Sequence, residues 1–271
     1  SYAYSSIGNL LSTTDPKGTV TSITYDATYQ IFPISMSNAL GHISQTVYYG
    51  VNESSIMSDP NYNAGLKGLW GQTMAVIDAN NQEAFKSYDT LGRLVKAYGP
   101  LDSYDIPSSE ILYDIQPTYA KITSKSRINA LQPGTIDTVE YSDGLGRLIQ
   151  TKSVSGTTGQ YIVSGQRVYD NRGQVVKAYI SRWTSNDLNT MDALPTDTVA
   201  HATFVYDAMG RKVKGINADN TYSNVQMDVW KSTNFDENGH MQKAYFDSRG
   251  KIITKEEYTG ADGRDAKNPA K

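Results

Sequence analysis

The chain has 271 residues, which is enough for one large all-β unit or for two ordinary domains. Its 25 Lys and Arg residues and 28 Asp and Glu residues are scattered and give a net charge of −3, so no basic stripe is available to neutralise a nucleic-acid backbone. Only 38 % of the residues are hydrophobic, and 20 are tyrosine, whose ring is apolar and whose hydroxyl is polar. We therefore expect a thin, aromatic core and no nucleic-acid partner.

Residue types and sequence patterns that are absent from the chain exclude several kinds of functional site and a membrane span. The chain has no cysteine, which removes disulfides, thiol catalysis and zinc–thiolate sites. The histidines at 42, 201 and 240 lie far apart and show no metal-ligand spacing. No apolar run approaches the ~18–20 residues of a membrane span, and the N-terminal residues lack the features of a signal peptide. The sequence thus predicts no metal, no cofactor and no membrane span.

A short motif recurs along the chain and predicts its fold. Its form is Tyr-Asp-x-x-Gly-Arg, as in residues 88–93, with Phe in place of Tyr in the last two copies. Asp can accept a hydrogen bond from the backbone N–H two residues on, and Gly at the fourth position suits a type I turn closed by a bulge. The residues of this repeat motif are Tyr25, Asp26, Tyr88, Asp89, Gly92, Arg93, Asp143, Gly146, Arg147, Tyr169, Asp170, Gly173, Tyr206, Asp207, Gly210, Arg211, Phe235, Asp236, Gly239, Phe246, Asp247 and Gly250.

A second type of turn alternates with the first. Residues 15–18, 38–41, 78–81 and 217–220 read Asp/Asn-x-x-Gly/Asn, and successive turns are about eleven residues apart. A four-residue turn and a strand of roughly seven residues fill such a spacing. The residues three, four and five positions after the turn Gly are typically apolar, charged and small, as in residues 95–97. This period of two predicts antiparallel strands with one buried face.

In chain order, we expect a repeat array over residues 1–258 with three loop insertions, near 50–71, 99–138 and 181–200. The second insertion contains a candidate strand over 118–127, and the third contains a candidate helical turn over 185–191. Residues 259–271 are small and charged, and we expect a flexible tail there. The chain begins in the middle of the pattern without an initiating Met, so we expect it to be a fragment of a longer protein.

The recurring Tyr-Asp pairs are interpreted as turn scaffolding. A catalytic carboxylate pair needs two acids that converge at ~5–10 Å. These aspartates instead recur at every turn, as a scaffold requires. We predict no catalytic residue among them.

These recurring turn motifs resemble those of a known family. Tyr-Asp-x-x-Gly-Arg copies separated by Asp-Pro-x-Gly or Asn-x-x-Gly turns resemble the YD (RHS) repeats of bacterial polymorphic toxins and teneurins. Residues 37–42, 141–152 and 172–177 are similar to recurrent phrases of SpvB-like proteins and of the insecticidal Tc-toxin B component. The likeness covers roughly residues 10–258.

The resemblance implies an all-β fold: an antiparallel YD/RHS-repeat β-strip that forms a curved segment of a hollow β-shell. It implies a secreted or cell-surface bacterial protein, partnered by other repeats of the parent shell and by an enclosed C-terminal polypeptide. The family's self-cleaving, shell-closing region is not found in this chain, and neither is a toxin domain. We therefore expect a non-catalytic wall segment that encapsulates a toxin or effector, with strand edges exposed for self-association.

A carbohydrate-binding or adhesin module is an alternative function. Trp70, Trp183 and Trp230, with neighbouring tyrosines, could stack on sugars as candidate ligand-binding residues. An aromatic ladder in a thin sheet is more often part of the core. A glycan array would separate the two interpretations.

Two further chemistries have weaker support in the sequence. A glycoside hydrolase would need two converging acids, and the available glutamates stand in no recognisable motif; they are Glu53, Glu83, Glu110, Glu140, Glu256 and Glu257. Residues 59–63 begin like a calcium loop, but Ala64 and Trp70 occupy the places where an EF-hand has Gly and Glu.

Overall fold

A computed structural model describes residues 1–53 and 67–258 of the chain. Throughout this part the chain is all-β and antiparallel and contains no α-helix, which confirms the predicted fold class. No helix within the described ranges is long and apolar enough to cross a membrane. The calcium-like segment at 59–63, most of the expected insertion at 50–71 and the expected tail at 259–271 lie outside the described residues.

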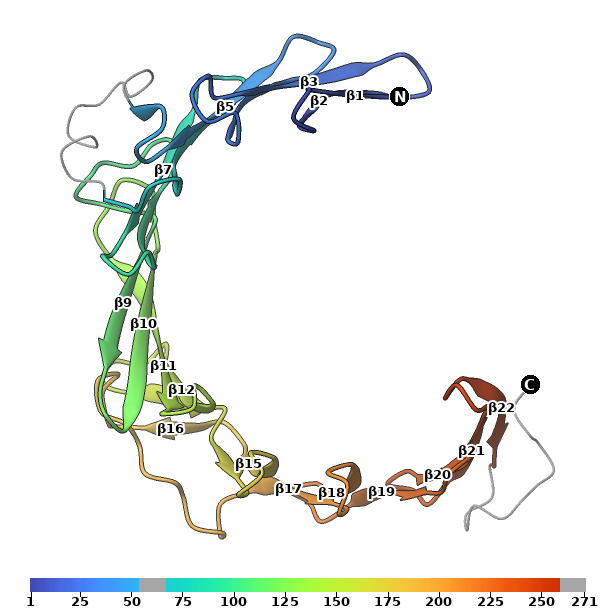
Figure 1. Ribbon diagram of the computed structural model, residues 1–271. Helices are drawn as coiled ribbons and strands as arrows, with labels where there is room; N and C mark the ends of the chain where they lie inside the picture. Colours follow the sequence, from blue (N-terminus) through green and yellow to red (C-terminus); the bar gives the residue numbers. More distant parts are fainter. Residues whose placement is uncertain (54–66, 259–271) are drawn as a thin grey trace. The chain divides into compact units, whose positions relative to one another are not determined.

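The strands are short and follow one another at the spacing predicted from the turns (Figure 1). Their bounds are β1 (Tyr2–Tyr4), β2 (Leu10–Thr14), β3 (Val20–Tyr25), β4 (Pro33–Ser37), β5 (Ile43–Tyr48), β6 (Thr73–Ile77), β7 (Glu83–Tyr88), β8 (Leu94–Tyr98), β9 (Ser109–Ile115), β10 (Tyr119–Arg127), β11 (Thr135–Asp143), β12 (Leu148–Val154), β13 (Tyr161–Ser164), β14 (Arg167–Tyr169), β15 (Val175–Tyr179), β16 (Arg182–Thr184), β17 (His201–Tyr206), β18 (Lys212–Ile216), β19 (Tyr222–Met227), β20 (Lys231–Phe235), β21 (Met241–Phe246) and β22 (Ile252–Glu257).

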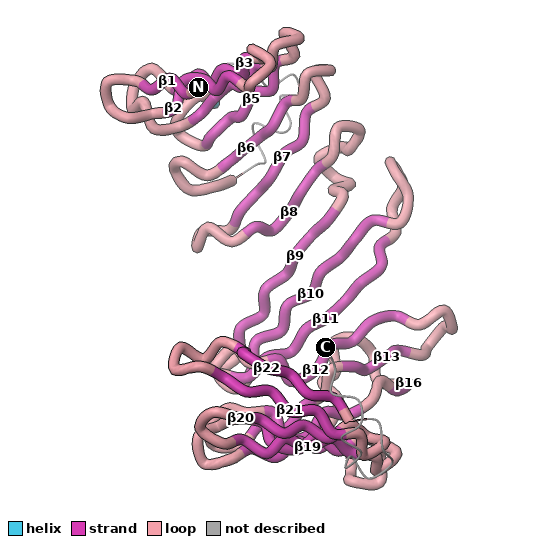
Figure 2. Tube along the Cα trace, turned by 90° about the vertical axis from the view of Figure 1, so that its right-hand side faces the viewer, coloured by secondary structure: helices cyan, strands magenta, loops and turns pink. Residues whose placement is uncertain are grey.

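Neighbours in sequence are almost always neighbours in the sheet. The hydrogen-bonded order is β1 to β13 in sequence followed by β16 in one sheet, and β14, β15 and β17 to β22 in the other. Figure 2 shows successive strands, such as β5 to β8, as a ladder of antiparallel segments. The sequential order is broken at one place, where the chain enters the second sheet at β14 and returns to the first at β16.

The chain divides into two compact units. Unit 1 comprises residues 1–114 and 122–138, and unit 2 comprises 115–121 and 139–271. Strands β9, β10 and β11 therefore contribute residues to both units.

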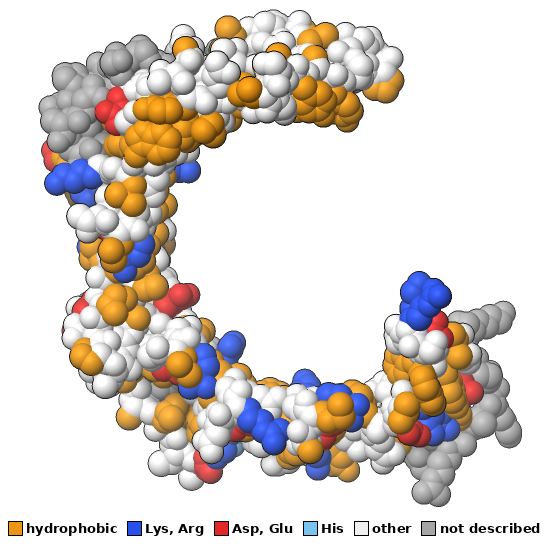
Figure 3. Space-filling model, in the orientation of Figure 1, with side chains coloured by type: hydrophobic (Ala, Val, Ile, Leu, Met, Phe, Trp, Pro, Cys, Tyr) orange, Lys and Arg blue, Asp and Glu red, His pale blue; other side chains and the backbone are white. Residues whose placement is uncertain are grey.

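Unit 1 has a small aromatic core. It is formed by buried residues of β5 to β8 and the turns that flank them, namely Val47, Tyr49, Met74, Ala75, Phe85 and Tyr98, with Tyr88 and Tyr104 packed against it. Within β7, Phe85 and Ser87 are buried while Lys86 between them is exposed, as the period of two predicts. Large hydrophobic side chains remain at the surface of many strands (Figure 3), because a single sheet layer covers little of its own area.

Unit 2 has a different core, in which half of the largest fully buried side chains are polar. Lys152, Gln150 and Gln166 are completely or almost completely buried, together with Tyr141 and the valines at 139 and 163. These residues lie on β11, β12 and β13 and on the link to β14, where the chain passes from one sheet to the other. A buried lysine in this place was not anticipated from the sequence.

The second expected insertion contains more sheet than the sequence indicated. Residues 99–138 include the expected strand, β10, and also β9 and the start of β11. Pro107, Pro117 and Pro133 stand just before β9, between β9 and β10, and just before β11. Proline is tolerated at these places because it removes no hydrogen bond from the ladder there. Residues 99–108 and 128–134 lie outside the strands.

The third expected insertion contains a short strand and a loop. Trp183 lies on β16, which pairs with β13, and residues 185–200 form irregular structure. The candidate helical turn at 185–191 is a single turn closed by a bond from the Thr190 N–H to the Asp187 carbonyl, at 3.3 Å. The Asp187 carboxylate accepts from the backbone N–H groups of Asn189 and Thr190, and such local bonds compete with helix formation.

Candidate functional site: the repeat turns and two buried charge pairs

The aspartate of the repeat motif organises the turn that it begins. Asp89 Oδ1 accepts from the N–H groups of Leu91 and Arg93, each at 2.9 Å, and Asp89 Oδ2 accepts from Arg93 Nε at 2.7 Å. The Gly92 N–H donates to the Asp89 carbonyl at 3.0 Å, with Gly92 at φ +78°. One side chain therefore accepts two backbone donors and the arginine of the same turn.

The same geometry recurs in the other complete copies. Asp143 and Asp207 hold Arg147 and Arg211 through Oδ2 at 2.7 Å, and Asp236 lies 2.9 Å from His240 Nδ1. Asp170 and Asp247 accept the same pair of backbone N–H groups, although Gln174 and Lys251 stand at the arginine position. The turn glycines of these copies have φ between +75° and +82°; they are Gly146, Gly173, Gly210, Gly239 and Gly250.

The tyrosine of the motif acts on a different hairpin. Tyr88, the last residue of β7, donates its hydroxyl to the carbonyl of Thr73, the first residue of β6, at 3.0 Å. The Tyr-Asp pair thus shapes one turn and bonds to the hairpin before it. Equivalent bonds run from Tyr25 to Leu10 (3.3 Å), Tyr48 to Pro33 (3.2 Å), Tyr113 to Leu94 (3.1 Å), Tyr169 to Leu148 (2.8 Å) and Tyr206 to Val175 (2.9 Å).

At four turns, the residue after the turn glycine reaches toward the next hairpin. The guanidinium of Arg93 lies 4.2 Å from the ring centroid of Tyr113, and Arg147 lies 4.6 Å from that of Tyr169, which are cation–π contacts. Where glutamine replaces arginine, its amide donates to the carbonyl of the next turn glycine instead, from Gln72 to Gly92 at 2.8 Å and from Gln174 to Gly210 at 2.7 Å. We refer to these tyrosine, arginine and glutamine contacts between hairpins as the inter-hairpin ladder.

Sequence reasoning found the turn but missed the ladder. The spacing explains Asp and Gly, whereas nothing local requires Tyr rather than another residue. Two signals were available in the sequence: Tyr or Phe directly precedes Asp in every copy except the one at Asp143, and Gln follows the turn glycine at 72 and 174. Phe235 and Phe246 have no hydroxyl, so they cannot make the tyrosine bond.

The first copy of the motif is a longer loop. Asp26 is only 5 % exposed, and its carboxylate accepts from the N–H groups of Tyr29, Ile31 and Phe32. Gln30 takes the positive φ, at +57°, that glycine has in the other copies. Burial acts to raise the pKa of Asp26, but the backbone donors outweigh it and the pKa is lowered.

The three tryptophans lie at separate places. Trp70 in the β5–β6 connection contacts Tyr29 and Phe32 edge-on, with ring centroids 5.2 and 5.1 Å apart, so it joins two neighbouring turns. Trp183 lies on β16 at the end of the first sheet, and Trp230 lies between β19 and β20 of the second. Each is more than half exposed. No contact between described residues brings them into one aromatic platform.

The glutamates considered for hydrolysis make local contacts. Glu110 lies 3.2 Å from Lys125 Nζ, and Glu256 Oε2 accepts from the hydroxyl of Tyr258 at 2.8 Å. Glu53 accepts from the Gly50 N–H, and Glu257 pairs with Lys255. Glu83 lies on β7 and Glu140 on β11. Among the described residues, no three His, Asp or Glu side chains gather as metal ligands.

A groove of about 550 Å³ opens beside the β20–β21 hairpin. Its lining includes Asp236, His240, Glu257 and Tyr258. The contact with His240 lowers the pKa of Asp236, so this carboxylate is ionised and already engaged in its own turn.

A buried charge pair closes the loop at 99–108 in unit 1. The guanidinium of Arg127 on β10 forms an ion pair with Asp102 and donates to the carbonyl of Ile106 at 2.9 Å. The Asp102 side chain is 1 % exposed and also accepts from the Gly99 N–H at 2.7 Å. Burial acts to raise the pKa of Asp102, and bonds from Ser108, Gly99 and Arg127 lower it overall.

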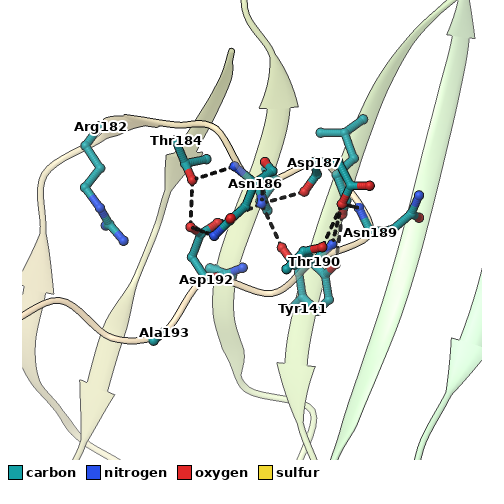
Figure 4. A network of polar contacts seen from close by, with 12 residues as sticks. Tyr141, Arg182, Thr184, Asn186, Asp187, Asn189, Thr190, Asp192 and Ala193 are labelled. Carbon is teal, nitrogen blue, oxygen red and sulfur yellow. Dashed lines mark hydrogen bonds and ion pairs between the residues drawn. The ribbon is translucent and has the colours of Figure 1, made fainter. Parts of the chain in front are cut away.

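A second buried charge pair lies in unit 2, where the loop after β16 crosses β12. Lys152 Nζ lies 2.7 Å from Asp192 Oδ2, and both side chains are buried. Asp192 Oδ1 accepts from Thr184 Oγ1 and Asn186 Nδ2, each at 2.8 Å (Figure 4). Burial acts to raise the pKa of Asp192, yet the bonds from Lys152, Thr184 and Asn186 lower it overall.

Buried amides complete this junction between the sheets. Gln166, on the link from β13 to β14, donates to the carbonyls of Asp192 and Ala193 at 3.3 and 3.2 Å. Its amide oxygen accepts from Arg182 on β16, and its backbone carbonyl accepts from the Tyr179 N–H at 2.9 Å. The side-chain amide of Gln150 lies 2.8 Å away. The link, the loop and two sheets are therefore fixed to one another by polar contacts.

Comparison with known proteins agrees with this architecture. Residues 4–43 match the family model of the RHS repeat. No curated protein matches the chain in sequence. Among solved structures, TcdB2-TccC3 has a TM-score of 0.69 and 18 % identity over 99 % of this chain. A TcdB2-TccC3-Cdc42 structure has a TM-score of 0.70 at 15 % identity, and a Tc holotoxin pore of Photorhabdus luminescens has 0.69 at 15 %, each again over 99 % of this chain.

The sequence identity between this chain and these structures is only 15–18 %, so the comparison establishes the fold alone. This chain spans 16–18 % of the length of the chains that it matches in them. The matched RHS repeat, the recurring turn of the same form and the sequential antiparallel sheet all agree. Residues 4–43 thus match the RHS repeat, and the fold of the whole chain resembles part of the TcdB2-TccC3 chain.

Proposed function

We propose that the chain is a non-catalytic wall segment of a secreted or cell-surface YD-repeat shell, which encloses a toxin or effector polypeptide. The observation that carries the proposal is the fold match to Tc-toxin structures over 99 % of the chain. On this proposal, residues 1–258 are an array within a longer shell, and its partners are further repeats and the enclosed polypeptide.

The contacts of the described residues support a wall. The inter-hairpin ladder joins hairpins along the strip. The carboxylates of the turn aspartates accept hydrogen bonds from their own turns. Glu110, Glu256 and Glu257 are likewise engaged by neighbouring side chains. Structural use of these carboxylates favours a role without catalysis.

The test is protease protection in the full protein that contains this chain. We expect the polypeptide encoded with it to resist a protease that digests the same polypeptide expressed alone. Weakening the ladder by combining Tyr169→Phe with Gln174→Ala should shorten the protection, because two links between neighbouring hairpins are lost. Tyr4→Phe, at a side chain 60 % exposed, is the control. Equal digestion of the accompanying and free polypeptide would contradict encapsulation.

The exposure of two tryptophan rings of unit 2, each more than half exposed, favours glycan binding as a second candidate function. The exposed Trp183 and Trp230 are its strongest candidates in unit 2. Binding on a glycan array that is lost in Trp183→Ala or Trp230→Ala would favour this function over a purely structural one.

A further inference from the structure

Lys152 occupies an oxygen-lined site at the centre of unit 2. The side chain projects from β12, is fully buried, and ends against a loop that belongs to a distant part of the sequence. Its Nζ donates to the carbonyls of Asn186 (3.0 Å), Asp187 (2.6 Å) and Thr190 (2.7 Å), and it lies 2.7 Å from Asp192 Oδ2. Four oxygens of residues 186–192 thus surround one nitrogen.

The chemistry of these oxygens matches a primary ammonium group. An –NH₃⁺ group has three donors and no acceptor, so every face of it can meet an oxygen. A neutral amine would turn a lone pair toward one of the four. The distances of 2.6–3.0 Å are those of charge-assisted hydrogen bonds, and most exceed the ~2.3–2.6 Å of calcium ligands.

The oxygens are held in place by contacts that do not involve the lysine. Asp187 Oδ1 accepts from the backbone N–H and the hydroxyl of Thr190, at 2.9 and 2.8 Å, which closes the turn. Tyr141 on β11 donates its hydroxyl to the Leu188 carbonyl at 2.8 Å. Asp192 is oriented by Thr184 and Asn186, as described above. Figure 4 shows these side chains converging from the loop and from β11.

We propose that residues 186–192 form a binding site for a primary ammonium ion, which in this protein is filled by the Nζ group of Lys152. The site is a property of the loop, and Lys152 supplies its occupant. It follows that shortening Lys152 leaves a site that takes up an external alkylammonium ion. The inference does not depend on the proposed shell function.

The first test uses Lys152→Ala and n-propylammonium, whose three carbons and nitrogen replace the atoms that the substitution removes. At constant ionic strength, we expect n-propylammonium to raise the unfolding temperature of this variant saturably. Tetramethylammonium has the same charge but no N–H donor, so it should have no such effect. The matched control is Lys177→Ala, which removes a partly exposed lysine that pairs with Asp197. An equal response to both ions, an equal response in both variants, or no response in folded Lys152→Ala would overturn the proposal.

The second test uses the unaltered protein, so it decides the matter even where Lys152→Ala does not fold. With lysine side chains labelled by ¹⁵N, a fully enclosed ammonium should give a signal protected from exchange with water near neutral pH, because exchange requires the loop to open. We expect that signal to disappear in Lys152→Arg, because this substitution removes the labelled nitrogen and so assigns the signal to Lys152. A wild-type spectrum without it, or its persistence in Lys152→Arg, would overturn the assignment.

Discussion

At the scale of the residue, the two members of a Tyr-Asp pair stabilise two different hairpins. Asp89 satisfies the backbone of its own turn, and Tyr88 donates to Thr73 in the preceding one. Tyrosine suits this position because its ring packs on the thin sheet and its hydroxyl still reaches a backbone carbonyl. Burial raises the pKa of Tyr88, which agrees with a hydroxyl enclosed between hairpins.

Removal of the tyrosine hydroxyl should weaken this contact selectively. We expect Tyr88→Phe, Tyr169→Phe and Tyr206→Phe each to lower the free energy of unfolding by about 1 kcal/mol, because a carbonyl loses its donor while the ring packing remains. Urea denaturation measures the change. Tyr4→Phe should leave stability unaltered, and an equal loss in this control would contradict the ladder.

Two glycines of one turn differ in backbone conformation but not in the space around them, so they isolate the effect of backbone strain. Gly146 has φ +75°, whereas Gly144, two residues earlier, does not adopt positive φ, and neither would bring a Cβ within 4 Å of another atom. Gly146→Ala should therefore cost about 1 kcal/mol in the free energy of unfolding through backbone strain alone. Gly144→Ala should be neutral or slightly stabilising. Identical urea midpoints for the two variants would show that the turn tolerates a side chain at both positions.

At the scale of the element, long loops are fixed by buried charges and ordinary turns are not. The loop at 99–108 is closed by Asp102 and Arg127, and the loop after β16 is closed by Lys152 and Asp192. A repeat turn needs only its own aspartate and glycine. A longer loop exposes more backbone polar groups than it can pair locally, so it requires partners from a neighbouring strand.

Breaking the unit 1 pair should release its loop. Asp102→Asn removes the carboxylate that faces Arg127 and leaves a guanidinium only 11 % exposed, so we expect a loss of about 3–5 kcal/mol in the free energy of unfolding. Limited proteolysis should then cut within residues 99–108. Glu110→Gln is the control, because its pair with Lys125 is about one quarter to one third exposed and is worth only ~0–1 kcal/mol. Similar losses for both variants would contradict the special role of the buried pair.

At the scale of the whole molecule, contacts between neighbouring hairpins take the place of one deep core. In such arrays stability is approximately the sum of terms within repeats and between adjacent repeats. Many of those terms here involve ionised aspartates. Side-chain or backbone donors of Arg147, Arg93 and Arg211 hold the pKa values of Asp143, Asp89 and Asp207 below their ordinary value.

This accumulation of lowered pKa values predicts acid sensitivity. A carboxyl whose pKa is lower in the folded chain stabilises the fold above the unfolded value of about 3.9, and that contribution is lost as the pH falls through the folded value. We therefore expect urea midpoints to be constant above about pH 5 and to fall steeply below about pH 4. Asp143→Asn should flatten part of the decline. Midpoints that do not change between about pH 5 and pH 3 would contradict this account.

The ends of the sheets should promote self-association. Within the described chain, β1 and β22 each pair on one side only, and β22 carries Ile252 and Ile253, which are 61 % and 66 % exposed. Open edges with apolar side chains template pairing with another chain. Light scattering should show a mass that rises over the micromolar range, and Ile253→Lys should reduce this rise. A strictly monomeric species would contradict edge pairing.

The sequence by itself determined the local structure of this protein. Asp, Gly and a spacing of about eleven residues fix a hairpin because turn chemistry and the two-residue strand period act over short range. Hairpins joined in sequence then pair with their neighbours, which is the topology found for β1 to β13. The sequence also carried the family resemblance, through motifs such as residues 88–93 and 206–211.

Only the tertiary structure decided which distant residues meet. The Tyr88 hydroxyl reaches a residue 15 positions away, and Lys152 meets oxygens 34–40 positions away. Neither contact has a local signature, because each depends on how one hairpin or loop lies against another. In the sequence, Lys152 lies in a strand whose residues alternate between apolar and polar, and this pattern predicts that its side chain is exposed. It is buried because the chain changes sheets beside it, and the loop that makes this crossing brings the oxygens that compensate its charge.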